Sequence, residues 1–248
     1  MQTPGKNCTI RIGTSGWQYD HWRGSFYPDN LKKQDFFSFY TRYFATVEIN
    51  SSFYRLPGEK NLKTLYDNSP EEFLFSVKAS RYITHLKKLK NPHQSLRAFF
   101  DRIRILKNKC GPVLFQLPPN WKADANRLAD FTAALPKGYS YVFEFRDHSW
   151  FNKEIYQILN RCNAALCIYG MGKYQSPRDV TADFVYVRLH GPEKNYKGRY
   201  SEEALEKWAE IFTRWAGAGK QVYCYFDNDE SGHAASDARR LTTMIQGV

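Results

Sequence analysis

The chain has 248 residues, of which 42% are hydrophobic and 17% aromatic, and its formal net charge is +11. This length suits one domain with a sizeable core, and no Ser/Gly-rich, Pro-rich or acidic stretch separates two domains. No stretch approaches the roughly 18 apolar residues that a membrane span needs, so we expect a single domain over residues 1–248 and no membrane partner.

Short apolar runs alternate along the chain with longer amphipathic stretches, which predicts strands and helices in turn. In chain order, the predicted strands are residues 9–14, 46–50, 73–78, 112–117, 139–146, 164–169, 184–190 and 221–227. The predicted helices are residues 34–44, 59–68, 92–108, 124–135, 153–162, 201–216 and 234–245. Most of the strand candidates are nearly continuous apolar runs, as expected for parallel strands that are covered on both faces.

Eight strands in alternation with helices predict an α/β fold, a single TIM-type (β/α)8 barrel. The sixth connection, residues 170–183, is short and irregular, so its helix is expected to be missing or reduced. An open doubly wound sheet is the competing fold, and it would favour a Gly-rich phosphate loop after the first strand. The residues from Gly13 to Trp17 lack the G-x-G-x-x-G spacing of such a loop, which favours the barrel.

The cysteines and the first residues of the sequence indicate the cellular compartment of the protein. The five cysteines, an odd number, include no C-x-x-C pair, and Cys167 and Cys224 lie inside apolar runs. Residues 1–7 lack the charged and apolar regions of a secretory signal. Both features are typical of a reduced, cytoplasmic protein in which thiols serve as small core residues.

Polar residues gather at the predicted carboxyl ends of the strands, which meet at one mouth of a barrel. Three strands end in two polar residues separated by one apolar residue, so that both point to the same side. These pairs are Glu48 and Asn50, Glu144 and Arg146, and Arg188 and His190. Other strand ends supply Lys78, Gln116 and Asn228, and the loop after the first strand supplies Trp17 and Tyr19. This convergence predicts one polar pocket.

Cations outnumber carboxylates in this set, which favours a small phosphorylated or carboxylated substrate. We assign anion binding to Lys78, Arg146 and Arg188. Glu48, Glu144 and His190 would transfer protons, as a lyase, isomerase or hydrolase requires. The other substrate contacts are assigned to Trp17, Tyr19, Asn50, Gln116 and Asn228. A non-catalytic binding module, whose charges form only a structural network, stays open as an alternative.

The sequence predicts no metal site. Its six histidines show no H-x-H or H-E-x-x-H spacing. An oxygen-rich set for Mg²⁺ or Mn²⁺ would need Glu48, Glu144, His190 and Asp227, and the cations assigned to the same pocket would repel the metal. The residues therefore require no cofactor, although a divalent cation stays compatible with them, and they do not indicate the oligomeric state.

The positive charge is concentrated in one segment. Between Lys78 and Lys109 there are ten Lys or Arg residues and one acid, Asp101. Such clustering is typical of a surface that binds polyanions, although a solvated helix face gives the same pattern. A nucleic-acid-binding protein or nuclease-like hydrolase is therefore the alternative function, using the helix at 92–108 together with Arg81, Lys87, Lys88 and Lys90. Trp17 and Tyr19 would then stack on a base.

A series of motifs runs through nearly the whole chain in order: GTSGW at 13–17, FYP at 26–28, TVEIN at 46–50, VKA at 77–79, LFQLPP at 114–119, EFR at 144–146, VRLHG at 187–191 and YFDND at 225–229. In these motifs the chain resembles the YecE-like family, DUF72. The resemblance implies a barrel fold and no particular reaction. It also implies that His85 joins the pocket as a substrate-binding residue. Asp147 stands where the family pattern has histidine, and Asp227 where asparagine is commoner.

Overall fold

The computed structural model describes residues 9–193 and 196–247. By their internal contacts the residues form two compact units. The first unit comprises Met1–Val47, Ile168–Arg178 and Asp183–Val248, and the second comprises Glu48–Cys167 and Asp179–Ala182. Residues 1–8, which include Cys8 and the segment expected to lack a secretory signal, lie outside the described residues.

The strands of the first unit are β1 (Ile10–Thr14), β9 (Gln221–Phe226), β8 (Phe184–Leu189) and the second half of β6 (Ala165–Met171), hydrogen-bonded in that order. Both β1 and β8 run parallel to β9. Every residue of β8 is buried, as expected for a continuous apolar strand that is covered on both faces. The short strand β7 (Tyr174–Gln175) pairs with β6 in antiparallel fashion.

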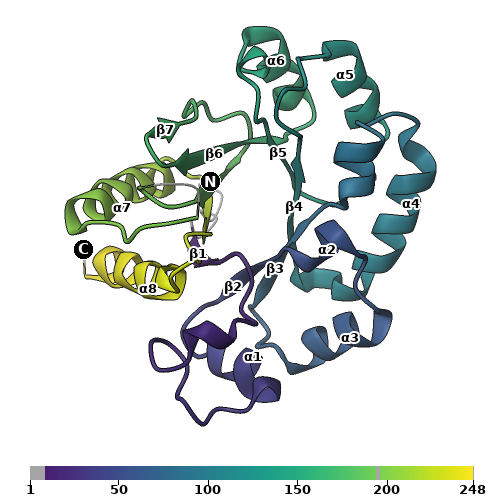
Figure 1. Cartoon of the computed structure of the whole chain (residues 1–248). Coiled ribbons are helices and arrows are strands. Elements are labelled where there is room, and N and C mark those ends of the chain that lie inside the picture. Colours follow the sequence, from purple (N-terminus) through teal and green to yellow (C-terminus); the bar gives the residue numbers. More distant parts are fainter. Residues whose placement is uncertain (1–8, 194–195, 248) are drawn as a thin grey trace, which may run out of the picture. The chain divides into compact units, whose positions relative to one another are not determined.

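The helices of the first unit are α1 (Phe36–Tyr40), α7 (Glu202–Gly217) and α8 (His233–Gln246). Figure 1 shows α7 and α8 packed side by side. The predicted start of α7 is confirmed, because Ser201 Oγ accepts a hydrogen bond from the backbone N of Ala204 at 3.2 Å. Acidic residues occupy the first turn of α7, where the helix dipole favours them.

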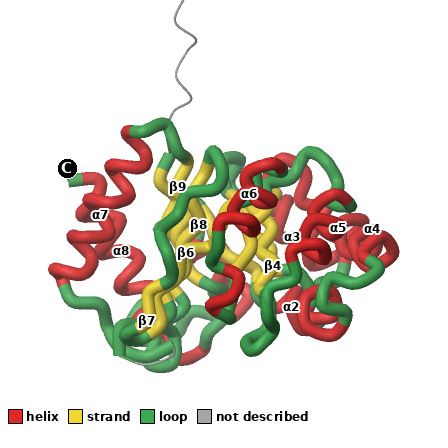
Figure 2. The backbone as a smooth tube through the Cα atoms, turned by 90° about the horizontal axis from the view of Figure 1, so that it is seen from above, coloured by secondary structure: helices red, strands yellow, loops and turns green. Residues whose placement is uncertain are grey.

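The second unit contains β2 (Thr46–Ile49), β3 (Leu74–Lys78), β4 (Cys110–Gln116) and β5 (Tyr141–Glu144), in the order β5-β4-β3-β2. The β3–β4 and β4–β5 pairs are parallel, as is the pairing of β5 with the first half of β6. Its helices are α2 (Ser51–Tyr54), α3 (Glu59–Asn68), α4 (Pro92–Ile103), α5 (Ala125–Ala133) and α6 (Lys153–Arg161). Figure 2 shows the helices α3, α4 and α5 of this unit on one side of strand β4.

Apart from β7, the described residues contain eight strands that alternate with helices, close to the predicted positions. The chain therefore has the predicted α/β fold of a TIM-type (β/α)8 barrel. The connection between β6 and β8 contains β7 and loop but no helix along its fully described length, which confirms the predicted reduction. Among the described residues, no helix is both long and apolar enough to cross a membrane.

Candidate active site

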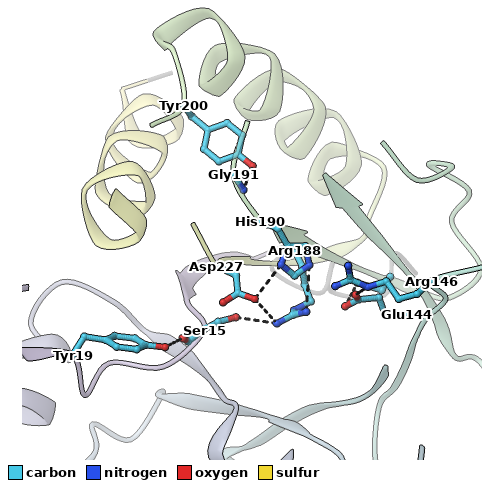
Figure 3. Close-up of polar contacts among 10 residues, drawn as sticks. Ser15, Tyr19, Glu144, Arg146, Arg188, His190, Gly191, Tyr200 and Asp227 are labelled. Carbon is cyan, nitrogen blue, oxygen red and sulfur yellow. Dashed lines mark hydrogen bonds and ion pairs between the residues drawn. The ribbon is translucent and has the colours of Figure 1, made fainter. Parts of the chain in front are cut away.

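The first unit buries an arginine near the end of β8. The Arg188 side chain is 1% exposed, and its Nη2 donates to Asp227 Oδ2 at 2.9 Å and to Ser15 Oγ at 3.3 Å (Figure 3). Ser15 follows β1 and Asp227 follows β9, so three neighbouring strand ends bring these groups together. A buried charge without a counter-charge costs several kcal/mol, and the Asp227 carboxylate offsets that cost.

His190 contacts both members of this ion pair and is completely buried. Its Nδ1 lies 3.0 Å from Asp227 Oδ2, and its Nε2 lies 3.3 Å from Nη1 of Arg188. Because a guanidinium only donates hydrogen bonds, we assign Nε2 as the acceptor and Nδ1 as the protonated nitrogen that faces the carboxylate. In this tautomer the lone pair of Nε2 accepts the hydrogen bond from Arg188.

A second buried carboxylate, Asp237 of α8, accepts hydrogen bonds from the segment that follows β9 and from the loop before α7. Its Oδ2 accepts hydrogen bonds from Asn228 Nδ2 at 2.8 Å and from the backbone N of Tyr200 at 3.0 Å, and its Oδ1 accepts one from Arg240 Nη1 at 3.0 Å. Asn228 Nδ2 also donates to the carbonyl of Gly198 at 2.9 Å. The Asn228 Oδ1 is buried and has no hydrogen-bond partner among the described residues.

Gly191 and Tyr200 fix the loop that follows β8. The backbone N of Gly191 donates to the Tyr200 hydroxyl at 3.0 Å, and burial raises the pKa of Tyr200 well above its ordinary value. Gly191 has a φ of +100°, a conformation that other residues rarely adopt. Tyr196, in the same loop, packs edge-on against the His190 ring at a centroid distance of 5.4 Å.

The aromatic loop after β1 forms a packed layer in the first unit. Trp17 is 7% exposed and packs on Phe37 at a centroid distance of 5.4 Å. Its Nε1 has no hydrogen-bond partner among the residues that the structure describes. Tyr19 donates from its hydroxyl to the carbonyl of Ser15 at 2.6 Å, which connects it to the neighbour of Arg188. The later aromatic residues of this loop are also buried: Trp22, Phe26 and Tyr27.

Asp229 lies two residues beyond Asp227 and is held by the same aromatic loop. Trp22 Nε1 donates to its Oδ1 at 2.5 Å, and His21 Nε2 lies 3.0 Å from its Oδ2. Burial raises the pKa of Asp229 to about 6, against the lowering effect of the contacts from Trp22 and His21. This carboxyl group therefore changes charge close to neutral pH.

In the second unit, Glu144 at the end of β5 is completely buried and paired with Arg146, which donates from Nε to Oε1 of Glu144 (Figure 3). The two side chains point to the same side, as their spacing predicts. Cys167 Sγ lies 3.9 Å from Glu144 Oε2. Cys167 and Cys224 are buried free thiols, as expected for small core residues.

Lys78 and His85 both contact Phe53, which the sequence did not single out as a site residue. Lys78 Nζ lies 4.5 Å from the ring centroid of Phe53, and the His85 ring lies edge-on to Phe53 at 5.0 Å. Burial, followed by the nearby charges of Lys78 and Arg81, lowers the pKa of His85 to about 4. His85 is therefore a neutral hydrogen-bonding group at neutral pH and contributes no positive charge.

The other predicted residues of the second unit lie at three strand ends. Glu48 of β2 is completely buried. Asn50 precedes α2, and its buried Oδ1 has no hydrogen-bond partner within the described part of the chain. Gln116 ends β4 and is in register with Glu144 of β5. Each unit thus holds its own set of predicted polar residues at strand ends.

Asp147, where the family pattern has histidine, caps the turn at His148–Trp150. It accepts hydrogen bonds from the backbone N of Ser149 at 3.0 Å and from Ser149 Oγ at 2.8 Å, and Lys122 Nζ lies 3.2 Å from its Oδ2. The hydrogen bonds from Ser149 lower the pKa of Asp147. The Asp147 carboxylate therefore caps this turn and forms an ion pair with Lys122.

Sequence reasoning missed Asp237, although a signal for it exists. The residue lies within the helical spacing of Ala234, Ala238 and Leu241, which form the buried face of α8. An acid on such an apolar face predicts a buried, hydrogen-bonded carboxylate. No group of three or more His, Cys, Asp or Glu residues within 9–193 and 196–247 is arranged to hold a metal ion.

Comparison with known proteins identifies relatives over the whole chain. UPF0759 protein YunF of Bacillus subtilis is 27% identical over 95% of this chain and 94% of its own. UPF0759 protein YecE of Escherichia coli K12 is 29% identical over 49% of this chain and 46% of its own. The crystal structure of a DUF72 family protein from Thermotoga maritima has a TM-score of 0.87 and 27% identity, covering 96% of this chain and 99% of that one.

A DUF72 family protein from Enterococcus faecalis has a TM-score of 0.82 and 19% identity over 96% of each chain, a likeness that shows the fold alone. The family model described as "Protein of unknown function DUF72" matches residues 11–247. This match spans nearly the whole sequence and agrees with the motifs at the strand ends. The chain belongs to the DUF72 family.

Proposed function

We propose that this protein is an enzyme that binds a small phosphorylated or carboxylated substrate and transfers protons on it. Arg188 holds the anion, because its planar guanidinium matches the oxygens of a phosphate or carboxylate. His190 acts as the general base at Nε2 once the substrate anion has drawn the Arg188 guanidinium away from that nitrogen, and Asp227 keeps its ring in the required tautomer. Glu48 and Glu144 are further proton-transfer groups.

One observation carries this proposal: a buried guanidinium, a buried imidazole and a carboxylate contact one another at strand ends. The three contacts of 2.9, 3.0 and 3.3 Å join Arg188, His190 and Asp227 in a closed triangle. Carboxyl ends of strands are where barrel enzymes carry their chemistry. A purely structural ion pair between Arg188 and Asp227 would not need an imidazole oriented by both partners.

The residues of the second unit have matching roles in the proposal. Arg146 and Lys78 bind anionic groups, and His85 offers a neutral ring nitrogen for a hydrogen bond. Asn50, Gln116 and Asn228 contact substrate hydroxyls, while Trp17 and Tyr19 contact its less polar part. We also propose that the chain works as one domain in the cytoplasm. Nucleic-acid binding through the 78–109 segment is the alternative function.

Thermal-shift screening of the full chain against phosphorylated and carboxylated small molecules tests the proposal. Compounds that stabilise the protein are then assayed for turnover with His190→Gln, Glu48→Gln and Glu144→Gln. We expect the His190 variant to lose at least about 100-fold in kcat, a usual effect of removing a general base. Glu206→Gln, an exposed change on α7, is the control and keeps full turnover. The proposal is wrong if all three site variants turn over an identified substrate like the wild type.

A further inference from the structure

The second unit contains a cleft of about 680 Å³ beside the start of α4. This volume lies within the usual range of small-ligand sites. Its apolar lining residues are Leu56, Ile83, Ala98 and Phe99, and its polar lining residues are Ser80, Asn91, Gln94 and Ser95. Tyr82, Lys87 and His93 complete the lining, and no lining residue is acidic. The cleft thus combines an apolar surface with positive charge.

The ten cations of the 78–109 segment fall into two groups in the structure. Six are engaged elsewhere. Arg97 and Arg104 pair with Asp101, Arg102 pairs with Glu59, Lys78 and Lys107 lie over aromatic rings, and Lys109 is buried against backbone carbonyls. Both cations of α4, Arg97 and Arg102, thus lie beside a carboxylate. The other four, Arg81, Lys87, Lys88 and Lys90, form no ion pair within the described residues, and two of them lie at longer range over rings: Lys87 over Tyr82 at 5.7 Å and Lys88 over Trp121 at 6.0 Å.

The loop that carries these cations has an unusual and well-fixed backbone. Lys88, Leu89 and Asn91 have φ values of +46°, +63° and +45°, which residues with side chains rarely adopt. The buried Leu89 donates from its backbone N to the carbonyl of Ile83 at 3.0 Å, and this anchors the loop. Uncommon backbone conformations concentrate at ligand sites, where packing holds them in place.

Tyr82 presents an open aromatic surface at the same cleft. Tyr82 is 49% exposed, and the Nζ of Lys87 lies 5.7 Å from the centroid of the Tyr82 ring. Helix α4 begins at Pro92 with no side-chain cap and no acid in its first turn, so its positive end is not neutralised locally. An aromatic ring beside clustered cations is the combination that binds a base together with its phosphates.

We infer that this cleft binds one nucleotide of a single-stranded nucleic acid, with the base in the cleft against Tyr82 and the neighbouring phosphates on Arg81, Lys87, Lys88 and Lys90. Of the four cations, only Lys87 lines the cleft, and the other three lie outside its lining. A nucleic-acid strand is therefore favoured over a free nucleotide, because its neighbouring phosphates can reach these outer cations. None of its residues belongs to the set that we assign to the proposed reaction. This site does not depend on that reaction.

Fluorescence anisotropy with a labelled single-stranded oligothymidylate of about 12 nucleotides tests the inference, using the full chain across a salt series. With four phosphate contacts, log K should fall with log salt at a slope of about −3. Lys88→Gln/Lys90→Gln should reduce the magnitude of that slope by roughly 1.4. Lys60→Gln/Lys63→Gln on α3 removes the same charge elsewhere in the second unit and should leave the slope unchanged.

A cleft-filling variant tests whether a base enters. Ala98→Trp, at an exposed position of α4 that lines the cleft, should weaken binding at least about tenfold, since base–aromatic stacking is lost. Ala133→Trp, at an exposed position of α5, is the matched control and should bind normally. The inference is overturned if the oligonucleotide does not bind, if Ala98→Trp binds it as tightly as the wild type, or if thymidine monophosphate binds as tightly as the oligonucleotide.

Discussion

His190 Nδ1 lies 3.0 Å from Oδ2 of Asp227, the same carboxylate oxygen that accepts a hydrogen bond from Arg188 Nη2 at 2.9 Å. Asp227 therefore has two effects that oppose each other in the proposed reaction. It faces the protonated Nδ1 of the imidazole, so that Nε2 can accept a proton once the substrate anion has drawn Arg188 away from it. It also accepts a hydrogen bond from Nη2 of Arg188, so this nitrogen is already engaged when the substrate anion is expected to contact the guanidinium.

Gly191 is required by the loop that follows β8. A Cβ added at this position would lie 2.1 Å from the carbonyl oxygen of Lys197. We expect Gly191→Ala to lower the free energy of unfolding by about 2 kcal/mol or more, because of this clash and the positive φ. Urea denaturation measures the change. Gly217→Ala, in helix α7 with open space around it, is the control and should keep or slightly raise stability. Equal stability of the two variants would contradict this assignment.

The raised pKa of Asp229 makes stability depend on pH. Its folded-state pKa of about 6 exceeds the value of about 3.9 expected in the unfolded chain, so the folded chain binds more protons between these values. This contribution is present below pH 4 and is lost as the pH rises through 6. We expect wild type to lose up to about 3 kcal/mol relative to Asp229→Asn between pH 4 and 7.

Urea denaturation across this pH range measures the Asp229 effect. The control is Asp130→Asn, at an exposed position of α5, which should follow the pH profile of the wild type. If Asp229→Asn also follows the wild-type profile, burial does not raise the pKa of Asp229 in solution.

His85 should titrate far below an ordinary histidine. Its pKa is lowered to about 4 by burial and by the charges of Lys78 and Arg81. The stability that this shift contributes is present above pH 6.5 and is lost as the pH falls through 4. NMR titration of the ring should show a neutral imidazole at pH 6. Lys78→Met should raise the pKa by about one unit, whereas Lys90→Met should change it little. A wild-type pKa near 6.5 would rule out this environment.

Much of the fold follows from local sequence patterns. The bounds of α3 coincide with the predicted residues 59–68, because its apolar and polar residues alternate with helical spacing. The short α2 and the π-helical turn at Tyr82–Leu86 were not predicted, since four or five residues do not establish a helical period. Tertiary packing of nearby residues determines such short elements.

The candidate site was predicted less completely than the fold. Spacing within one strand predicted that Glu144 and Arg146 face the same side, and the structure pairs them. Strand spacing could not predict that Ser15 and Asp227 both contact Arg188, because these residues are far apart in the sequence. Nor could it separate the exposed Lys88 from the buried Lys109, since the burial of Lys109 depends on Tyr66 and Ser69 of a distant helix end.

Isothermal titration of inorganic phosphate into wild type, Arg188→Lys and Asp227→Asn tests most directly whether Arg188 holds the substrate anion. Arg188→Lys keeps the charge but loses the planar fork, so we expect binding at least about tenfold weaker. Asp227→Asn removes the carboxylate that competes for the guanidinium, so we expect binding about tenfold tighter, with Asp130→Asn as the unchanged control. Phosphate that binds wild type and both site variants equally, or that fails to bind the wild type, would contradict the account.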